Sequence, residues 1–197
     1  MKTTLNSIFT FLLVSIFATN GLGQYQLPNR LFKKNEADIL TGFGLFPTFV
    51  KDQVNQVLPP LTLRYEYRIS SNYSLGLEFG HSIATTRKEE LYSDERQYRN
   101  RFYFLALRNS AHCNCDNFDN WDIYGGFALG FNLTHISVIN GNFGELEKLY
   151  GIRPRNTQLT FHGFVGTRYA CTNRLSFFGE FGYGASLFQI GLGYKLW

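Results

Sequence analysis

The sequence predicts an all-β protein, an eight-stranded antiparallel up-and-down transmembrane β-barrel, from three observations. Apolar and polar residues alternate in eight runs, each close to the length of about 9–11 residues that a tilted membrane-crossing strand needs. The connections between the runs are alternately tight and long, as in a barrel with turns on one rim and loops on the other. A composition with 20 Phe and 12 Tyr but a single Met in 197 residues also favours strands over helices.

The first 23 residues have the pattern of a secretory signal peptide. Lys2 provides the positive start, and Ile8 to Ala18 form an apolar stretch shorter than the roughly 20 residues of a spanning helix. We therefore expect residues 1–23 to be removed on export. The mature chain should then consist of a periplasmic leader at residues 24–34 and one outer-membrane barrel domain over residues 35–197.

The first four expected strands follow the leader. They lie at residues 36–46, 60–69, 73–83 and 98–109, and the second and third are joined by a tight turn. These two strands show the clearest alternation, with apolar side chains at their odd positions. Their even positions carry small, polar or charged side chains, namely Thr62, Arg64, Glu66, Arg68, Gly76, Glu78 and Gly80.

The last four expected strands lie at residues 120–133, 158–170, 174–183 and 186–197. The longest connection of the chain precedes the second of them, and a tight turn follows it. The same alternation continues to the end of the chain. On the final strand Phe188, Ile190, Leu192, Tyr194 and Leu196 share one face, and Gln189, Gly191, Gly193 and Lys195 share the other.

The location of the apolar face decides between two kinds of barrel. A soluble lipocalin-like barrel would hold it inside, but eight strands enclose room only for side chains or one small ligand. The apolar set would overfill that space, whereas glycines on the other face make room for long charged side chains. We therefore expect the apolar face to meet lipid. The expected lumen charge network is Arg64, Glu66, Arg68, Glu78, Arg108, His162, Arg168 and Glu180.

Two further expectations concern this lumen. If the second and third strands pair so that Ile69 faces Tyr73, Arg64 comes opposite Glu78 in a favourable cross-strand pair. His162 should point inward as a hydrogen-bonded residue of the filled interior. A lumen filled in this way leaves no aqueous channel.

With these features, residues 35–197 resemble the small eight-stranded outer-membrane barrels of Gram-negative bacteria, the OmpA-transmembrane and OmpX-like group. The resemblance implies a monomer in the outer membrane, in contact with membrane lipid and lipopolysaccharide. It also implies that the barrel assembly machinery reads the final strand through Phe188, Ile190, Leu192, Tyr194, Leu196 and Trp197. The apolar series here ends at Leu196, one residue out of step with the aromatic last residue of that family.

Three cysteines, Cys113, Cys115 and Cys171, fall in expected periplasmic turns. An oxidising compartment allows one disulfide, between Cys171 and either Cys113 or Cys115. His112 adjoins the first two, but the spacing is shorter than that of usual zinc ligands, and we predict no metal and no cofactor. The basic residues behind the net charge of +4 are scattered among acidic ones, and with export they argue against nucleic acid.

His135 and Ser137 share one face of the fifth expected strand and are the candidates for catalysis. A lipid A-modifying enzyme of the outer membrane would use such residues, but a carboxylate that could orient the histidine is not evident nearby. The interpretation is a non-enzymatic barrel with a filled polar lumen, whose role is structural or depends on surface interactions of its extracellular loops. The two alternatives to this interpretation are a lipid A-modifying outer-membrane enzyme and a secreted lipocalin-like ligand-binding barrel.

Overall fold

The computed structural model of the chain describes residues 32–48, 54–88, 96–113, 120–140, 143, 144, 151 and 153–197. The expected signal peptide and most of the expected leader therefore lie outside the described residues. Within the described part of the chain, no helix is long and apolar enough to cross a membrane.

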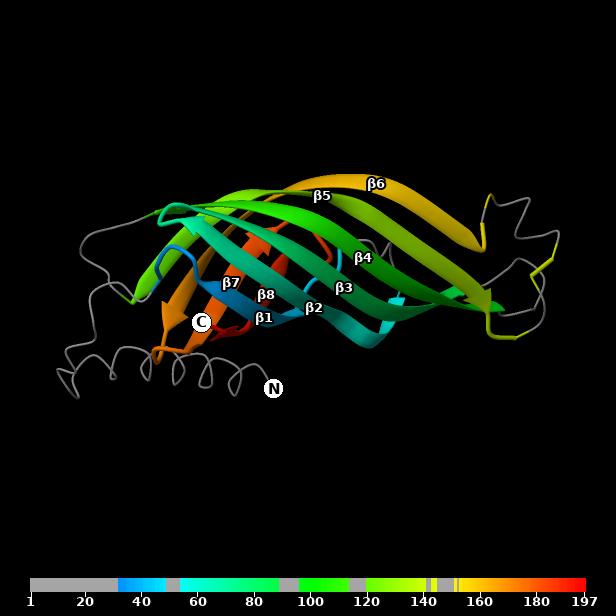
Figure 1. Ribbon diagram of the computed structural model, residues 1–197. Coiled ribbons are helices and arrows are strands. Elements are labelled where there is room, and N and C mark those ends of the chain that lie inside the picture. The colour runs from blue at the N-terminus through cyan, green and yellow to red at the C-terminus, as the bar shows by residue number, and fades with distance from the viewer. Residues whose placement is uncertain are drawn as a thin grey trace, which may run out of the picture.

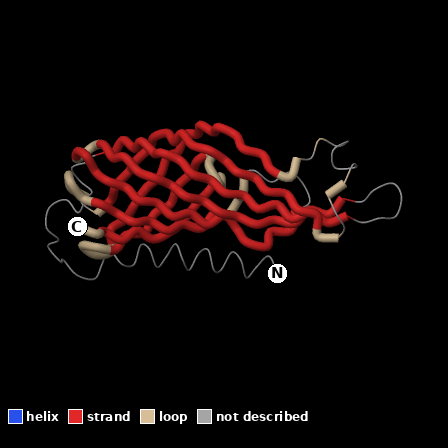
Figure 2. The backbone as a smooth tube through the Cα atoms, turned by 45° about the vertical axis from the view of Figure 1, so that its right-hand side comes forward, coloured by secondary structure: helices blue, strands red, loops and turns tan. Residues whose placement is uncertain are grey.

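Eight antiparallel strands form a closed barrel in which each strand pairs with its chain neighbours and β1 pairs with β8 (Figure 1). The strands are β1 (Ala37–Gly44), β2 (Val54–Ser70), β3 (Tyr73–Lys88), β4 (Arg96–Cys113), β5 (Trp121–Val138), β6 (Arg155–Ala170), β7 (Leu175–Gly182) and β8 (Phe188–Lys195). They run obliquely around the barrel (Figure 2). The predicted fold class, strand number and strand order are confirmed.

The strands differ in length more than the sequence indicates. Strands β2 to β6 have 16 to 18 residues, whereas β1, β7 and β8 have eight each. The long strands project past the short ones at the end where the loops lie, which we call the loop end (Figure 1). The opposite end, with both termini of the barrel, is the turn end. The loop-end extension of β3 was not predicted because polar side chains there occupy both faces, as with Thr85 and Thr86.

The two faces of the barrel wall have opposite character. Apolar side chains point outward, and Leu159 and Phe161 are 67% and 68% exposed. Charged side chains point inward, and Glu78 and Arg168 are each 1% exposed. Arg64 lies opposite Glu78 in the ladder between β2 and β3, as predicted, but Tyr73 pairs with Ser70 rather than with Ile69, because the register shifts between Arg68 and Ser70 next to the turn.

Glycines on the inward face make room for the large side chains of the lumen. A Cβ atom added at Gly166 would lie 2.7 Å from the ring of Tyr124, and one at Gly191 would lie 2.6 Å from the ring of Phe178. Both distances are shorter than van der Waals contact. The interior is therefore packed to the point where two aromatic rings need glycine opposite them.

Gly166→Ala is expected to destabilise the barrel by about 1–3 kcal/mol, because the added methyl group overpacks the contact with Tyr124. Gly179→Ala is the matched control, since an added Cβ there meets nothing within 4 Å. The unfolding midpoint in urea, followed by tryptophan fluorescence in lipid vesicles, measures both. Equal midpoints for the two variants would contradict close packing between Gly166 and the ring of Tyr124.

Candidate functional site

The middle of the lumen holds four charged side chains, the central cluster, in alternating contact. Arg64 on β2 donates two hydrogen bonds to Glu180 on β7, at 2.7 and 2.8 Å, and its Nε lies 3.4 Å from Glu78 on β3. Arg108 on β4 donates to Glu78 at 2.6 Å and to Glu180 at 2.8 Å. Each carboxylate thus lies between two guanidinium groups, and each residue is at most 3% exposed.

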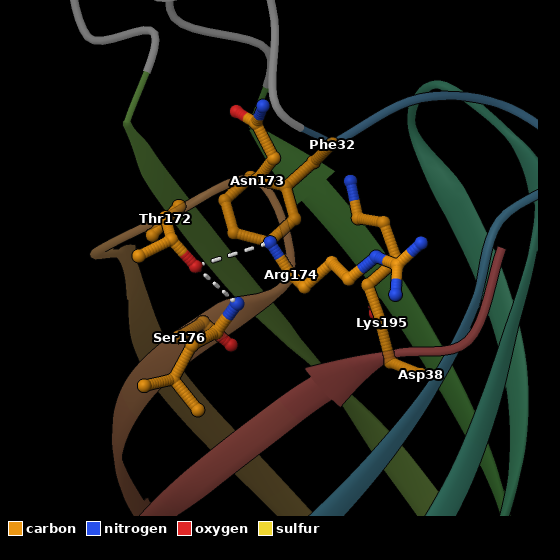
Figure 3. A pocket seen from close by; sticks show the side chains of 9 residues that line it. Phe32, Asp38, Thr172, Asn173, Arg174, Ser176 and Lys195 are labelled. Carbon is orange, nitrogen blue, oxygen red and sulfur yellow. Dashed lines mark hydrogen bonds between the residues drawn. The ribbon is translucent and has the colours of Figure 1, made fainter.

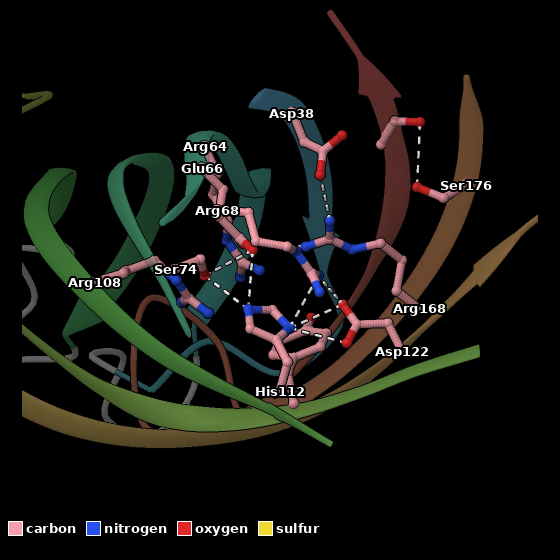
Figure 4. A network of polar contacts seen from close by, with 12 residues as sticks. Asp38, Arg64, Glu66, Arg68, Ser74, Arg108, His112, Asp122, Arg168 and Ser176 are labelled. Carbon is pink, nitrogen blue, oxygen red and sulfur yellow. Dashed lines mark hydrogen bonds and ion pairs between the residues drawn. The ribbon is translucent and has the colours of Figure 1, made fainter. Parts of the chain in front are cut away.

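A second group of buried charges, the turn-end cluster, lies nearer the turn end, where Glu66 and Arg68 precede the β2–β3 turn. Figure 4 shows the side chains of this cluster. Arg168 on β6 donates to Asp38 on β1 at 2.8 Å and to Glu66 on β2 at 3.1 Å. The hydroxyl of Ser74 on β3 donates to the other oxygen of Glu66 at 3.0 Å. Arg168 therefore joins strands on opposite sides of the lumen.

His112 on β4 extends the turn-end cluster toward β5. Its Nδ1 lies 2.9 Å from the carboxylate of Asp122, and its Nε2 lies 2.8 Å from the hydroxyl of Ser74. Arg68 donates to the same carboxylate at 2.6 Å. The imidazole thus connects the β2–β3 side of the lumen with β5 through hydrogen bonds.

The part of the lumen nearer the loop end is mainly aromatic. The guanidinium carbon of Arg108 lies 3.5 Å from the ring centroid of Phe164, a close cation–π contact. His162 is buried and packs against Phe104, with ring centroids 5.4 Å apart. Its Nδ1 has no hydrogen-bond partner, so the expectation of a hydrogen-bonded His162 is wrong for that atom. Packing between aromatic rings, rather than hydrogen bonding, holds the side chain.

Phe32, from the segment before β1, lies at the turn-end mouth of the barrel. The cationic groups of Arg68, Arg168 and Lys195 lie 5.3, 5.6 and 5.7 Å from its ring centroid. The ring lines a small recess with Asp38 and the residues of the β6–β7 turn (Figure 3). Phe32 therefore covers the guanidinium groups that face this mouth.

The structure places all eight residues of the expected charge network inside the barrel, each at most 5% exposed. Seven of them form ion pairs with one another or with Asp38 and Asp122, and His162 lies apart from these pairs. The network expected from the sequence omitted Asp38, Ser74, His112, Asp122 and Tyr124. The alternation of β5 indicates that Asp122 and Tyr124 point inward, but they were not included in the charge network, whereas His112 was considered only as a neighbour of cysteines.

The final strand has the division that its sequence indicates. Ile190, Leu192 and Tyr194 are 40–45% exposed on the outward face of β8, and Gln189 is buried on the inward face. Phe188 and Leu196 are partly exposed, and Trp197 is exposed. Whether an assembly machinery reads this strand stays a prediction.

The cysteines do not lie as the sequence suggested. Cys113 is the last residue of β4 rather than part of a turn, and Cys113 and Cys171 both have free thiols. Strand β5 separates β4 from β6, so the two Cα atoms lie on strands roughly 10 Å apart, beyond the reach of a disulfide. The expected Cys171–Cys113 pairing is therefore wrong. Cys115 lies outside the described residues, and no group of metal ligands occurs among those described.

His135 and Ser137 lie on the outward-facing side of β5, opposite Arg101 and Arg99 of β4. Arg155 of β6 is the other cross-strand neighbour of His135. Arginines therefore occupy the neighbouring positions where a catalytic triad would need a carboxylate. Arginine neighbours favour the binding of an anion at this place over proton transfer by His135.

Comparisons with known proteins bear on the fold. No family model matches the chain, and no curated protein matches its sequence. The outer membrane protein OprG from Pseudomonas aeruginosa is similar in structure, with a TM-score of 0.51 and 14% identity over 83% of this chain and 97% of that one. This chain has the fold of an outer-membrane β-barrel.

Two other solved structures align with lower TM-scores. The attachment invasion locus protein Ail of Yersinia pestis, in complex with the heparin analogue sucrose octasulfate, aligns at 11% identity with a TM-score of 0.49. The alignment covers 83% of this chain and 99% of Ail. The N-terminal β-barrel domain of Pseudomonas aeruginosa OprF aligns at 13% identity with a TM-score of 0.45, over 83% of this chain and 99% of that domain.

Glu180→Gln is expected to destabilise the barrel by roughly 3 kcal/mol, because Arg64 and Arg108 both lose a buried counter-charge. Urea unfolding in lipid vesicles measures the loss. The control is Glu36→Gln, which removes the 2.9 Å ion pair with Lys195 at the more accessible turn end. That change should cost at most about 1 kcal/mol. A loss for Glu180→Gln no larger than that of the control would contradict this account of the central cluster.

A maleimide is expected to label both Cys113 and Cys171 without reductant in a Cys115→Ser variant, as measured by the mass of the folded protein. Partial burial raises the pKa of the Cys171 thiol. Because the thiolate reacts, its labelling rate should reach half of its maximum at a higher pH than the value of about 8.5 at which an unperturbed thiol does so. Labelling that requires prior reduction would contradict free thiols. The same measurement on the wild-type chain tests the alternative pairing of Cys171 with Cys115.

Proposed function

We propose that this chain is a non-conducting barrel of the outer membrane, with a structural role and with its long connections presented outside the cell. The turn end would face the periplasm and the loop end the exterior. The expected signal peptide and leader belong to this proposal, as do the monomeric state and the absence of catalysis. Assembly by the barrel insertion machinery also belongs to it.

The observation that carries the proposal is the central cluster. Arg64 and Glu180 belong to β2 and β7, which are separated in the barrel by β1 and β8, so their contact crosses the lumen. Arg108 reaches the same Glu180 from β4. An interior blocked by paired side chains has no continuous space for water, as expected for a barrel of eight strands.

The outward face supports a membrane location. On β5 the outward positions are apolar or glycine from Ile123 to Leu133, close to the length of about 9–11 residues that a tilted strand uses to cross a bilayer. Trp121 and Tyr169 form a contact at the turn-end boundary, with ring centroids 4.9 Å apart. Aromatic residues at such boundaries are typical of outer-membrane barrels.

The secreted lipocalin-like alternative is disfavoured by the same two faces. A soluble barrel would have to expose the rings of Phe161 and Phe181 to water while it buried four arginines. Its ligand would have to displace ion pairs from the lumen, because the described interior is occupied by them. The lipid A-modifying alternative is disfavoured by the arginine neighbours of His135.

The purified barrel is expected to give no stable conductance steps in planar bilayers, because the central cluster blocks the lumen. Folded protein in the sample is verified by a gel that compares boiled with unboiled chain, on which an intact barrel migrates differently. Cell fractionation followed by detergent extraction tests the membrane location separately. Reproducible channels from the folded fraction, or recovery of the chain without detergent, would rule out the proposal.

A further inference from the structure

Basic side chains form a row across the outward face of three neighbouring strands near the loop end. In the register, Arg101 on β4 lies opposite His135 on β5, and His135 lies opposite Arg155 on β6. Arg99, two residues nearer the loop end, lies opposite Ser137. We call these five residues the basic row. All five are partly or fully exposed.

The basic row begins where the apolar belt ends. The next outward positions toward the turn end pair Tyr103 with Leu133, and those after them pair Leu105 with Phe131. Tyr103 also stacks on His81, with ring centroids 4.5 Å apart, as an aromatic boundary residue would. With the barrel in a membrane, the basic row lies at the height of the outer-leaflet headgroups.

Among the residues that the structure describes, the arginines of the basic row have no carboxylate partner of the kind that every lumen arginine has. Each of the four buried guanidinium groups contacts at least one carboxylate. No described residue forms an ion pair with Arg99, Arg101 or Arg155. Arg99 and Arg101 lie two residues apart on one face of β4, and Arg155 lies on the far side of β5, so an anion placed among these guanidinium groups would accept charge-assisted hydrogen bonds.

We propose that the basic row binds the phosphate groups of an outer-leaflet glycolipid of the lipid A type. Arg101 and Arg155 flank His135 and suit a phosphate bidentately, and the Ser137 hydroxyl can donate a further hydrogen bond. The inference rests on the proposed function, because only a barrel that spans the membrane places this row beside headgroups.

A lipid is favoured over a soluble polyanion because the wall below the row is apolar. Phe131, Leu159 and Phe161 lie on β5 and β6 directly toward the turn end and are 58–68% exposed. An acyl chain can pack on these side chains while its phosphate lies against the row. A soluble anion would use the charges alone and would leave this apolar surface uncovered.

The test measures the unfolding midpoint of the folded barrel in phosphatidylcholine vesicles that contain increasing amounts of bisphosphorylated lipid A. A ligand that binds only the folded state raises this midpoint, and the titration gives an apparent Kd. Dephosphorylated lipid A provides the matched lipid. The variant Arg101→Gln/Arg155→Gln removes two charges, and Arg174→Gln removes one exposed charge from the turn between β6 and β7.

Wild type and Arg174→Gln should be stabilised by the phosphorylated lipid and not by the dephosphorylated one. The double variant should bind about tenfold more weakly while it folds normally on the boiled-against-unboiled gel. Equal stabilisation by both lipids, or an unchanged double variant, would overturn the inference. Inorganic phosphate or a sulfated oligosaccharide that reproduces the effect with the same arginine dependence would also overturn it, in favour of a soluble anion.

These outcomes are separable from a failure of the proposed function. Conductance depends on the lumen, which the outward substitutions do not touch. A barrel that conducts ions but requires Arg101 and Arg155 for phosphate-dependent stabilisation would contradict only the closed lumen. A barrel that gives no conductance and is not stabilised by phosphorylated lipid A would contradict only the inference about the basic row.

Discussion

The ion pairs that cross the lumen are the interaction on which the rest of this structure depends. Four guanidinium groups are enclosed by eight strands, and burying an unpaired charge in such a place costs several kcal/mol. Carboxylates from non-adjacent strands must therefore reach them, as Glu180 on β7 reaches Arg64 on β2 and Arg108 on β4. Long side chains that meet at the axis leave little space at the wall. Glycine consequently faces the rings of Tyr124 and Phe178, and the interior is closely packed at these positions.

The barrel wall is closed only over the length that the short strands β1, β7 and β8 cover. At Gly163 the carbonyl group of β6 still accepts a hydrogen bond from Tyr183, at 3.2 Å, but the described residues provide no partner strand beyond it. Strand β2 has a similar free edge beyond Leu61, and there Pro59 and Pro60 remove two backbone donors. Proline at a free edge discourages pairing with another strand. The two edges are thus unequal, because only that of β2 is blunted in this way.

Local features of the barrel could be predicted from the sequence, and features that depend on closure could not. The pairing of Arg64 with Glu78 lies within one hairpin, where the alternation of the two strands indicates it, although the register shifts between Arg68 and Ser70 beside the turn. The contact of Arg64 with Glu180 requires the stagger of the whole barrel, which no single hairpin contains. Asp38 was missed for a similar reason, since its partner Arg168 lies on the non-adjacent strand β6. His112 was missed although Ser74 and Asp122 lie on the strands next to it, because it was considered only as a neighbour of cysteines. The Cys171–Cys113 pairing failed because β4 continues through Cys113, which a boundary uncertain by a few residues did not reveal.

The lumen arginines have carboxylate partners among the described residues and those of the basic row do not. We attribute this difference to their different depths in the proposed membrane orientation. An arginine facing lipid at the midplane costs about 2–4 kcal/mol, but close to the interface this cost falls to about 0–1 kcal/mol. Alternation therefore forces the mid-strand arginines inward, where carboxylates must pair with them. Arg99 and Arg101 occupy outward positions of β4 beyond the apolar belt, where the proposed orientation places the headgroups. In that orientation the same pleat that points the mid-strand arginines into the lumen points these two side chains toward the phosphate groups of the outer leaflet.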